Sequence, residues 1–127
     1  MKNVVYKMLK IYVPYSNLDW MNYKLVKEDL SFHHIKKRVD GGKKTIENGA
    51  ILQSVSHSYL HLIEHIDIQT YMALNEIFKV VNEQKHEPTV LQRDMIESIL
   101  QLFEKNHKWD KNRDGEVLIK YKYLKRW

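Results

Sequence analysis

Five of the seven histidines in this 127-residue chain lie between residues 31 and 65, in two groups separated by a pair of glycines. His33 and His34 are adjacent, in a short run over 32–35 that predicts a strand. The later group repeats every four residues, which stacks side chains on one face of a helix; it consists of His57, His61 and His65. Imidazole binds metals and moves protons near neutral pH. The segment therefore predicts a strand, a turn and a helix that gather several imidazoles round one point.

The residues between the two groups predict how these elements are joined. The Asp-Gly-Gly sequence at 40–42 supplies the positive backbone φ angles that a tight reversal needs. The apolar run 50–55 predicts a returning strand. Ser56 is a candidate N-cap for a helix that continues to about Ile66. This order predicts two antiparallel strands, joined by a hairpin loop and followed directly by a helix.

Three further segments have patterns that favour strands. Residues 2–13 alternate loosely between apolar and polar side chains, and residues 21–26 form a second short apolar run. Residues 116–124 alternate more regularly and predict a C-terminal strand. We therefore expect an α+β fold in which short strands flank the central unit.

Two helices are expected after the histidine segment. Asp67 is a candidate cap for a helix that ends at about Gln84, and Thr89 with Gln92 forms a capping-box pattern at the start of the next helix. Each helix has an apolar stripe that we expect to pack in the core. The stripes are Tyr71, Leu74, Phe78 and Val81 in the first helix, and Leu91, Met95, Ile99 and Leu102 in the second.

Length and composition narrow the class of protein. We expect one domain over 1–127, with a motif core at about 30–66 and a helical extension at about 67–108. No run of about 20 apolar residues predicts a membrane span, so we expect a cytoplasmic protein without a membrane partner. The absence of cysteine excludes disulfides and thiolate zinc sites. The net charge of +5 favours a nucleic-acid partner, although many basic surfaces are merely solvated.

The segment from His33 to His61 resembles the motif of HNH endonucleases, and in particular the spacing found in the bacterial colicin DNases. The His33-His34 pair is followed by Asn48 fourteen residues after the second histidine, then by His57 nine residues later and His61 four residues after that. The similarity covers about a quarter of the chain. It implies a ββα-metal (His-Me finger) core, in which two antiparallel strands and a helix surround one divalent ion. It also implies hydrolysis of phosphodiester bonds in DNA.

The resemblance implies a role for each matched residue. His34 would be the general base that takes a proton from the attacking water, and Asn48 would brace the loop between the strands. His33, His57 and His61 would hold one divalent ion beside the scissile phosphate and the departing 3′ oxygen. We expect Mg or Mn as the working ion. Zn or Ni is the expected occupant of a purified sample, because these ions suit imidazole ligands better.

Neighbouring residues in a strand point to opposite faces, so His33 and His34 can serve one site only where the strand ends or bulges. Glu64 is either a partner for the second nitrogen of a ligand histidine or plainly exposed. His65 matches no family position and is either such a partner, a phosphate contact or a surface histidine. Basic side chains flank the hairpin and either grip phosphates or are solvated; they are Lys36, Lys37, Arg38, Lys43 and Lys44.

Two alternatives to a nuclease stay open. A non-catalytic protein on the same scaffold would bind nucleic acid or another protein, as an accessory factor or inhibitor of a phage or mobile element. A helical domain with scattered surface histidines would have no joint site at all. A homodimer or a protein partner is a further open point, since a small nuclease needs one to read DNA sequence.

Overall fold

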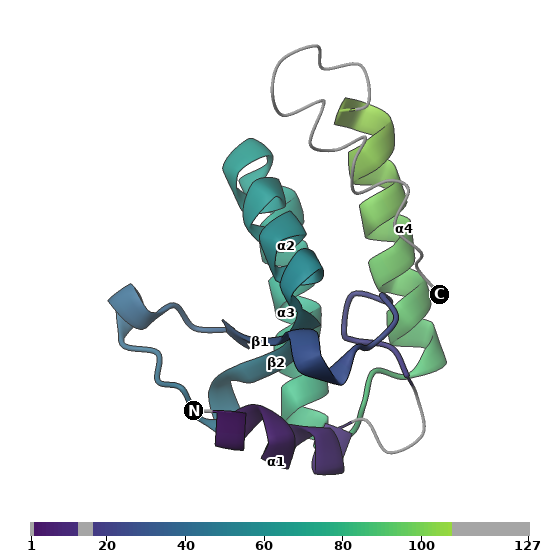
Figure 1. Cartoon of the computed structure of the whole chain (residues 1–127). Helices are drawn as coiled ribbons and strands as arrows, with labels where there is room; N and C mark the ends of the chain where they lie inside the picture. Colours follow the sequence, from purple (N-terminus) through teal and green to yellow (C-terminus); the bar gives the residue numbers. More distant parts are fainter. Residues whose placement is uncertain (1, 13–16, 108–127) are drawn as a thin grey trace.

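Two short antiparallel strands form the centre of the fold in the computed structural model, which describes residues 2–12 and 17–107. Four helices pack round them within the described ranges, so the protein has a mixed α+β architecture (Figure 1). The elements in chain order are α1 (Lys2–Tyr12), β1 (Leu30–His34), β2 (Gly49–Gln53), α2 (Ser54–Ile66), α3 (Ile68–Gln84) and α4 (Val90–His107). Within these ranges no helix combines the length and apolar character that crossing a membrane requires.

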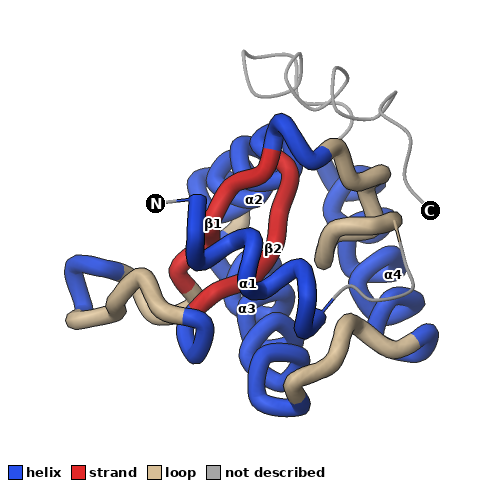
Figure 2. The backbone as a smooth tube through the Cα atoms, turned by 60° about the horizontal axis from the view of Figure 1, so that its bottom comes forward, coloured by secondary structure: helices blue, strands red, loops and turns tan. Residues whose placement is uncertain are grey.

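The two strands pair in a register that runs from Leu30 opposite Gln53 to His34 opposite Gly49. Figure 2 shows them side by side at the centre of the molecule. β2 is buried along its whole length, and α2 begins at the next residue without an intervening loop. This direct junction fixes the first turns of α2 beside the sheet. The expected hairpin and the helix after it are therefore confirmed.

Helices cover both faces of the hairpin. α2 and α3 pack against each other and against β2, while α1 packs against both strands. The side chains of Phe32 and Met8 press on Gly49, where an added Cβ would lie 2.4 and 2.9 Å from their nearest atoms. A side chain at this position would therefore have to displace the Phe32 ring and the end of the Met8 side chain.

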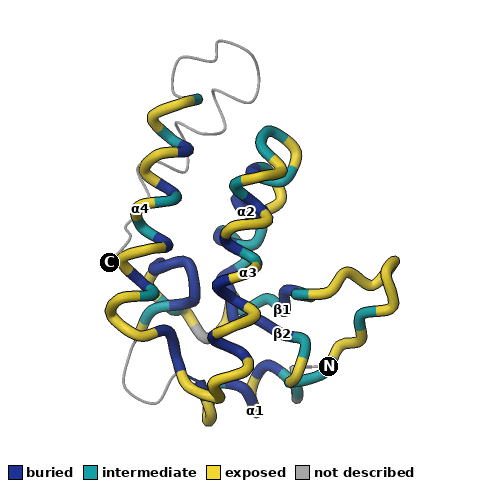
Figure 3. The backbone as a smooth tube through the Cα atoms, turned by 180° about the vertical axis from the view of Figure 1, so that it is seen from behind, coloured by how far each residue is buried: buried dark blue, intermediate teal, exposed yellow. Residues whose placement is uncertain are grey.

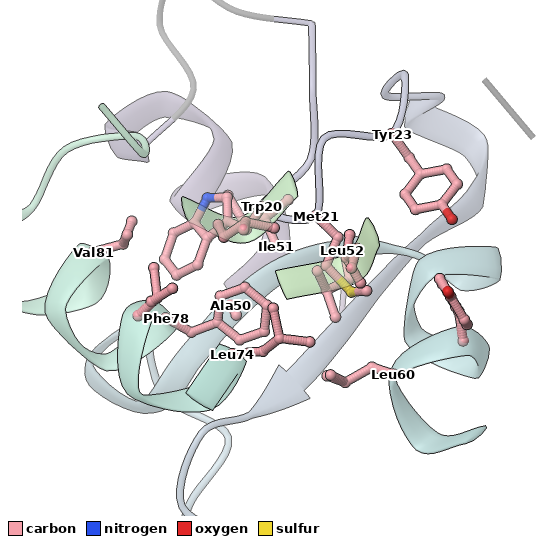
Figure 4. Packing of buried hydrophobic residues seen from close by; sticks show 14 of the residues in the cluster. Trp20, Met21, Tyr23, Ala50, Ile51, Leu52, Leu60, Leu74, Phe78 and Val81 are labelled. Atoms are coloured by element: carbon pink, nitrogen blue, oxygen red, sulfur yellow. The ribbon is translucent and has the colours of Figure 1, made fainter. Parts of the chain in front are cut away.

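The core forms where the loop before β1 meets β2 and α3. Trp20 is fully buried, with its ring 5.3 Å from that of Tyr12 and 6.2 Å from that of Phe78. Figure 4 shows Trp20 and Ile51 lying against Phe78 and its neighbours in α3. The helices after the hairpin are thus tied through one apolar cluster to the strand that carries His33.

The loop between β1 and β2, residues 35–48, projects from the side of the molecule (Figure 1). Figure 3 shows that most of it is exposed. Two short 3-10 turns, Arg38–Asp40 and Ile46–Asn48, shape it, and Gly41 at φ +92° makes the expected left-handed reversal. This loop carries the basic side chains predicted to meet nucleic acid.

The prediction of a strand over 2–13 is wrong. Residues 2–12 form α1, and the residues that it buries are Val5, Met8 and Tyr12, at helical rather than alternate spacing. Residues 21–26 are also not a strand, since the segment folds back on itself through a single bridge between Leu18 and Lys24. Asn22 at φ +69° makes this reversal. The predicted strand over 116–124 lies outside the described residues.

Helix ends and faces were predicted with mixed success. Asp67 caps α3 by accepting from the Thr70 amide, and α3 ends at Gln84 as expected. Thr89 and Gln92 exchange the two hydrogen bonds of a capping box. Ser56 is not the N-cap of α2, which begins two residues earlier; its hydroxyl donates instead to the buried Asp19.

The apolar stripe predicted for α4 is wrong at Leu91, Met95 and Leu102, which are exposed, while Ile99 is partly buried against the core. Leu91 and Leu102 are 70% and 60% exposed. The face that packs in the core carries Arg93, Ile96, Leu100 and Phe103. The stripe predicted for α3 is confirmed, because Tyr71, Leu74, Phe78 and Val81 are all buried.

Candidate functional site

Three imidazoles lie together beside the junction of the sheet and α2. His33 comes from β1, while His57 and His61 come from successive turns of α2. The ring centroid of His33 lies 5.4 Å from that of His57 and 6.4 Å from that of His61, and the two α2 rings are 4.6 Å apart. The His33 residue is buried, His57 is half-buried and His61 is exposed, so the cluster runs from the core to the surface.

Each ring of this cluster is held at one nitrogen by another side chain. Nδ1 of His57 lies 2.5 Å from Oγ of Ser31, and Nδ1 of His61 lies 3.3 Å from Oε1 of Glu64. Nε2 of His33 lies 2.8 Å from Oδ1 of Asn75. Histidines that bind metals are usually oriented in this way, with the second nitrogen bonded to an oxygen of the protein.

The Nε2 atoms of His57 and His61 face each other at 3.1 Å. Glu64 accepts only from a protonated Nδ1 of His61, which leaves a lone pair on Nε2 of that ring in its neutral form. Two nitrogens bound to one tetrahedral zinc at about 2.0–2.1 Å would lie about 3.3 Å apart. The separation of the two nitrogens is therefore close to the one that a shared metal ion would require.

The ring of His33 lies next to this pair, but the three rings together are not arranged as a metal site. No group of three or more His, Asp or Glu side chains within residues 2–12 and 17–107 is already arranged as a metal centre. Nδ1 of His33 has no hydrogen-bond partner in that part of the chain, and it is the nitrogen of that ring left available to a ligand. The donor set suits Zn, Ni, Co or Mn.

Two of the three rings are electrically neutral at pH 7. Burial lowers the pKa of His33 to about 4, against the opposing hydrogen bond from Asn75. Burial and the neighbouring His61 and His34 lower the pKa of His57 to about 4 as well. Metal ligands must be deprotonated, so these rings are in the state that binding requires.

His34 is the last residue of β1, which confirms the expectation that the histidine pair stands at a strand end. Its ring lies edge to face on Phe32 at 4.8 Å. Burial, Arg38 and Lys44 together lower the pKa of His34. Strand alternation turns His34 to the opposite face of β1 from His33. No described ring contact joins His34 to the three-ring cluster, but His34 is close enough to lower the pKa of both His33 and His57.

Asn48 joins the two ends of the projecting loop. Its Oδ1 accepts from the Lys36 amide at 2.7 Å, and its Nδ2 donates to the carbonyls of Lys36 and Lys43 at 3.0 Å each. Its own carbonyl accepts from the Ile35 amide at 2.9 Å. Asn48 therefore holds Ile35 through its backbone carbonyl and Lys36 through its side chain, and these are the two residues directly after His34.

The five basic side chains of the loop fall into two groups. Lys37 pairs with Glu64 and lies 5.5 Å from the centre of the Tyr71 ring, while Lys44 lies 5.8 Å from the centre of the Phe32 ring. All five residues are exposed, but the side chains of the other three have no described ion pair or ring contact: Lys36, Arg38 and Lys43. These three are the cations best placed to meet an external polyanion.

Glu64 links the loop to the cluster through Lys37 and His61. Burial raises its pKa, but the hydrogen bonds from these two partners outweigh that effect and hold the pKa below its usual value. The sequence-based suggestion that Glu64 contacts a ligand histidine is consistent with this geometry. His65 is exposed on α2, and no described contact joins it to the three rings.

Sequence reasoning missed two residues that hold the rings. Ser31 lies two residues before His33, and strand alternation puts both on one face, so the sequence carried a local signal for it. Asn75 lies 42 residues after His33 on α3, and no spacing pattern connects the two.

Comparison of the chain with protein-family models, with curated proteins and with solved structures finds no match. Function must therefore be inferred from the residues of the site.

Proposed function

We propose that this protein is a metal-dependent HNH-type endonuclease that hydrolyses phosphodiester bonds in DNA. β1, β2 and α2 would form its ββα-metal core. The observation that carries the proposal is the gathering of His33, His57 and His61 from a strand and a helix, each with one nitrogen held by a protein oxygen. The bracing contacts of Asn48 on the intervening loop support it.

His33, His57 and His61 would hold one divalent ion. The lowered pKa values of His33 and His57 keep these two rings neutral, as metal binding requires. Bound there, the ion would neutralise charge on the scissile phosphate and stabilise the leaving 3′ oxygen. Mg or Mn is the proposed ion in catalysis, and Zn or Ni the proposed occupant after purification. The products would carry a 5′-phosphate and a 3′-hydroxyl.

His34 would act as the general base. Its lowered pKa keeps the imidazole neutral near pH 7, so one ring nitrogen can accept the proton of the attacking water. Asn48 would keep this base in place, because it fixes the backbone of Ile35 and Lys36, the two residues that follow His34.

DNA would lie against the projecting loop. Lys36, Arg38 and Lys43 would contact phosphates on either side of the cleaved bond, which positions DNA without reading its sequence. Lys37 would instead stay with Glu64 and help to hold His61.

Cleavage of supercoiled plasmid tests this proposal directly. Wild type is expected to nick the plasmid with Mg or Mn and to lose activity with a chelator. His34→Ala should abolish nicking, whereas His65→Ala, a change in an exposed histidine of α2, should leave it intact. Absence of cleavage with Mg, Mn, Zn, Ni or Co would contradict the proposal.

One observation favours a non-catalytic role on the same scaffold. Nε2 of His57 faces Nε2 of His61, and Asn75 holds Nε2 of His33, so contacts within the protein engage each ring without a metal ion. In that case the protein would bind nucleic acid or another protein as an accessory factor or inhibitor. DNA binding without cleavage in the same plasmid assay would support this second function.

A further inference from the structure

We propose that Asn75 of α3 is a positioning residue of the histidine cluster, which holds His33 as the Nε2–H tautomer and leaves Nδ1 as its ligand atom. Asn75 lies outside the HNH-like segment and is half-buried. Its side chain makes two contacts with the end of β1: Oδ1 meets Nε2 of His33 at 2.8 Å, and Nδ2 donates to the Ile35 carbonyl at 2.7 Å.

The second of these contacts fixes the orientation of the amide. The Ile35 carbonyl can only accept a hydrogen bond, so the NH₂ group of Asn75 must face it. The amide oxygen then faces His33, and an amide oxygen can only accept. Nε2 of His33 must therefore carry the proton. In a neutral imidazole the lone pair is then on Nδ1.

Packing alone does not select this arrangement. The His33 ring contacts the rings of Tyr71 and Phe78 edge to face, with centroids 6.2 and 5.9 Å away. An imidazole that turns over about its Cβ–Cγ bond keeps nearly the same shape, so apolar contacts hardly distinguish its two nitrogens. The hydrogen bond to Asn75 does distinguish them, because a reversed ring would leave the oxygen of this half-buried amide without its donor.

The tautomer of His33 stands on the two Asn75 contacts alone, while its use toward a metal rests on the proposed nuclease function. Oxygen partners on the non-ligand nitrogen of a histidine typically affect metal affinity by about 10- to 100-fold. Loss of Asn75 should therefore weaken metal binding although Asn75 itself would not touch the ion.

Asn82 provides a matched control on the same helix. It lies two turns after Asn75 in α3, and its Nδ2 donates to the carbonyls of Ile46 and Gly49 at 2.6 and 2.8 Å. Asn82 thus clamps the hairpin to α3 by the same chemistry as Asn75, but its side chain makes no described contact with a histidine. Asn82→Ala should cost stability without disturbing His33.

The experiment combines ring NMR of the metal-free protein with Zn²⁺ titration of the full chain. In ¹⁵N spectra, wild type should show His33 as the Nε2–H tautomer with a slowly exchanging ring proton. Asn75→Ala should lose that protected proton and bind Zn²⁺ about 10- to 100-fold more weakly. Asn75→Asp, which keeps the acceptor, should retain the proton, and Asn82→Ala should match wild type in both measurements.

An Nδ1–H tautomer in wild type, or an Asn75→Ala variant that behaves like Asn82→Ala, would overturn the inference. The ring spectrum needs neither metal nor DNA. A protein with the expected spectrum but no Zn²⁺ binding or cleavage would therefore contradict the proposed function and leave the tautomer assignment standing. If Asn75→Ala fails to fold, the wild-type tautomer and the Asn75→Asp spectrum still decide the matter.

Discussion

Oε2 of Glu64 accepts from Nζ of Lys37, so a cation of the projecting loop is held against the helix that carries two of the clustered histidines. The other carboxylate oxygen of Glu64 accepts from His61. One side chain therefore connects the loop expected to meet DNA with the imidazoles expected to bind metal. It therefore divides the exposed loop cations into Lys37, which is ion-paired, and those that have no carboxylate partner among the described residues.

This division predicts unequal effects on DNA binding. Lys36→Gln, Arg38→Gln and Lys43→Gln should each reduce the slope of log K against log salt by about 0.9, because each removes one phosphate contact. Lys37→Gln should leave the slope unchanged, since Lys37 is paired with Glu64. Fluorescence anisotropy at several salt concentrations measures the slopes, with Lys79→Gln on the exposed face of α3 as a control. Equal slopes for all variants would mean that the loop is merely solvated.

Gly42 should be far less tolerant of substitution than its neighbour Gly41. A Cβ on Gly42 would lie 1.8 Å from the Lys36 carbonyl oxygen and 2.9 Å from Nδ2 of Asn48, so Gly42→Ala must break the Asn48 brace. Gly41 has open space round it, and Gly41→Ala carries only the strain of φ +92°, about 1–2 kcal/mol. We expect plasmid nicking to fall about 10-fold or more in Gly42→Ala, as misplaced catalytic groups commonly cause. Similar activities in the two variants would show that the brace does not serve catalysis.

The buried His33 should make the folded protein less stable in mild acid. Its pKa falls from 6.5 in the unfolded chain to about 4 in the folded one, so the unfolded state binds more protons between those values. The contribution of neutral His33 to the free energy of unfolding is complete above pH 6.5 and is lost as the pH falls toward 4. At 1.36 kcal/mol per pKa unit, this loss is at most about 3 kcal/mol. Urea unfolding from pH 4 to 8 measures it. His33→Gln should reduce this dependence without abolishing it, because the pKa of His57 is also lowered to about 4, and the exposed His65→Gln should leave it unchanged. A flat wild-type profile would contradict the assignment.

The face of α4 that packs in the core can be tested by stability. Ile96→Ala and Leu100→Ala should each lower the free energy of unfolding by about 2–5 kcal/mol, because both side chains are fully buried. Leu91→Ala and Leu102→Ala, on the exposed face, should change it by less than about 0.5 kcal/mol. Denaturant unfolding measures these free energies. A larger loss in Leu91→Ala and Leu102→Ala than in Ile96→Ala and Leu100→Ala would show that the buried face is the one expected from sequence.

Local chemistry explains which elements the sequence predicted well. The caps at Asp67 and at Thr89 each join residues only three positions apart in the chain, and both form as expected. The hairpin was predictable because two short apolar runs flank an Asp-Gly-Gly reversal.

The failures come from contacts between distant residues. In α4 a buried Arg93 donates to the carbonyl of Asp19 and to the side chain of Asn22, so a charged residue occupies the core face. Because arginine is usually exposed, sequence reasoning assigns Arg93 to the solvent face of α4 and so predicts the wrong buried face. In α1 the short apolar run fits both alternation and helical spacing, and packing against Trp20 and the hairpin favours the helix.

The candidate site shows the same limit. The spacing of His33, Asn48, His57 and His61 was visible in the sequence, because all four lie within one strand-turn-helix unit. Asn75 belongs to a helix that reaches His33 only through tertiary packing, so no sequence motif could include it.

Titration of the metal-free protein with Zn²⁺ tests most directly whether the three imidazoles share one ion. Wild type should bind one equivalent. His33→Ala, His57→Ala and His61→Ala should each weaken binding about 100-fold or more, as loss of a ligand requires, while His34→Ala should stay within about three-fold of wild type. No Zn²⁺ binding by wild type, or an equal loss in His34→Ala and His57→Ala, would contradict the proposed metal centre.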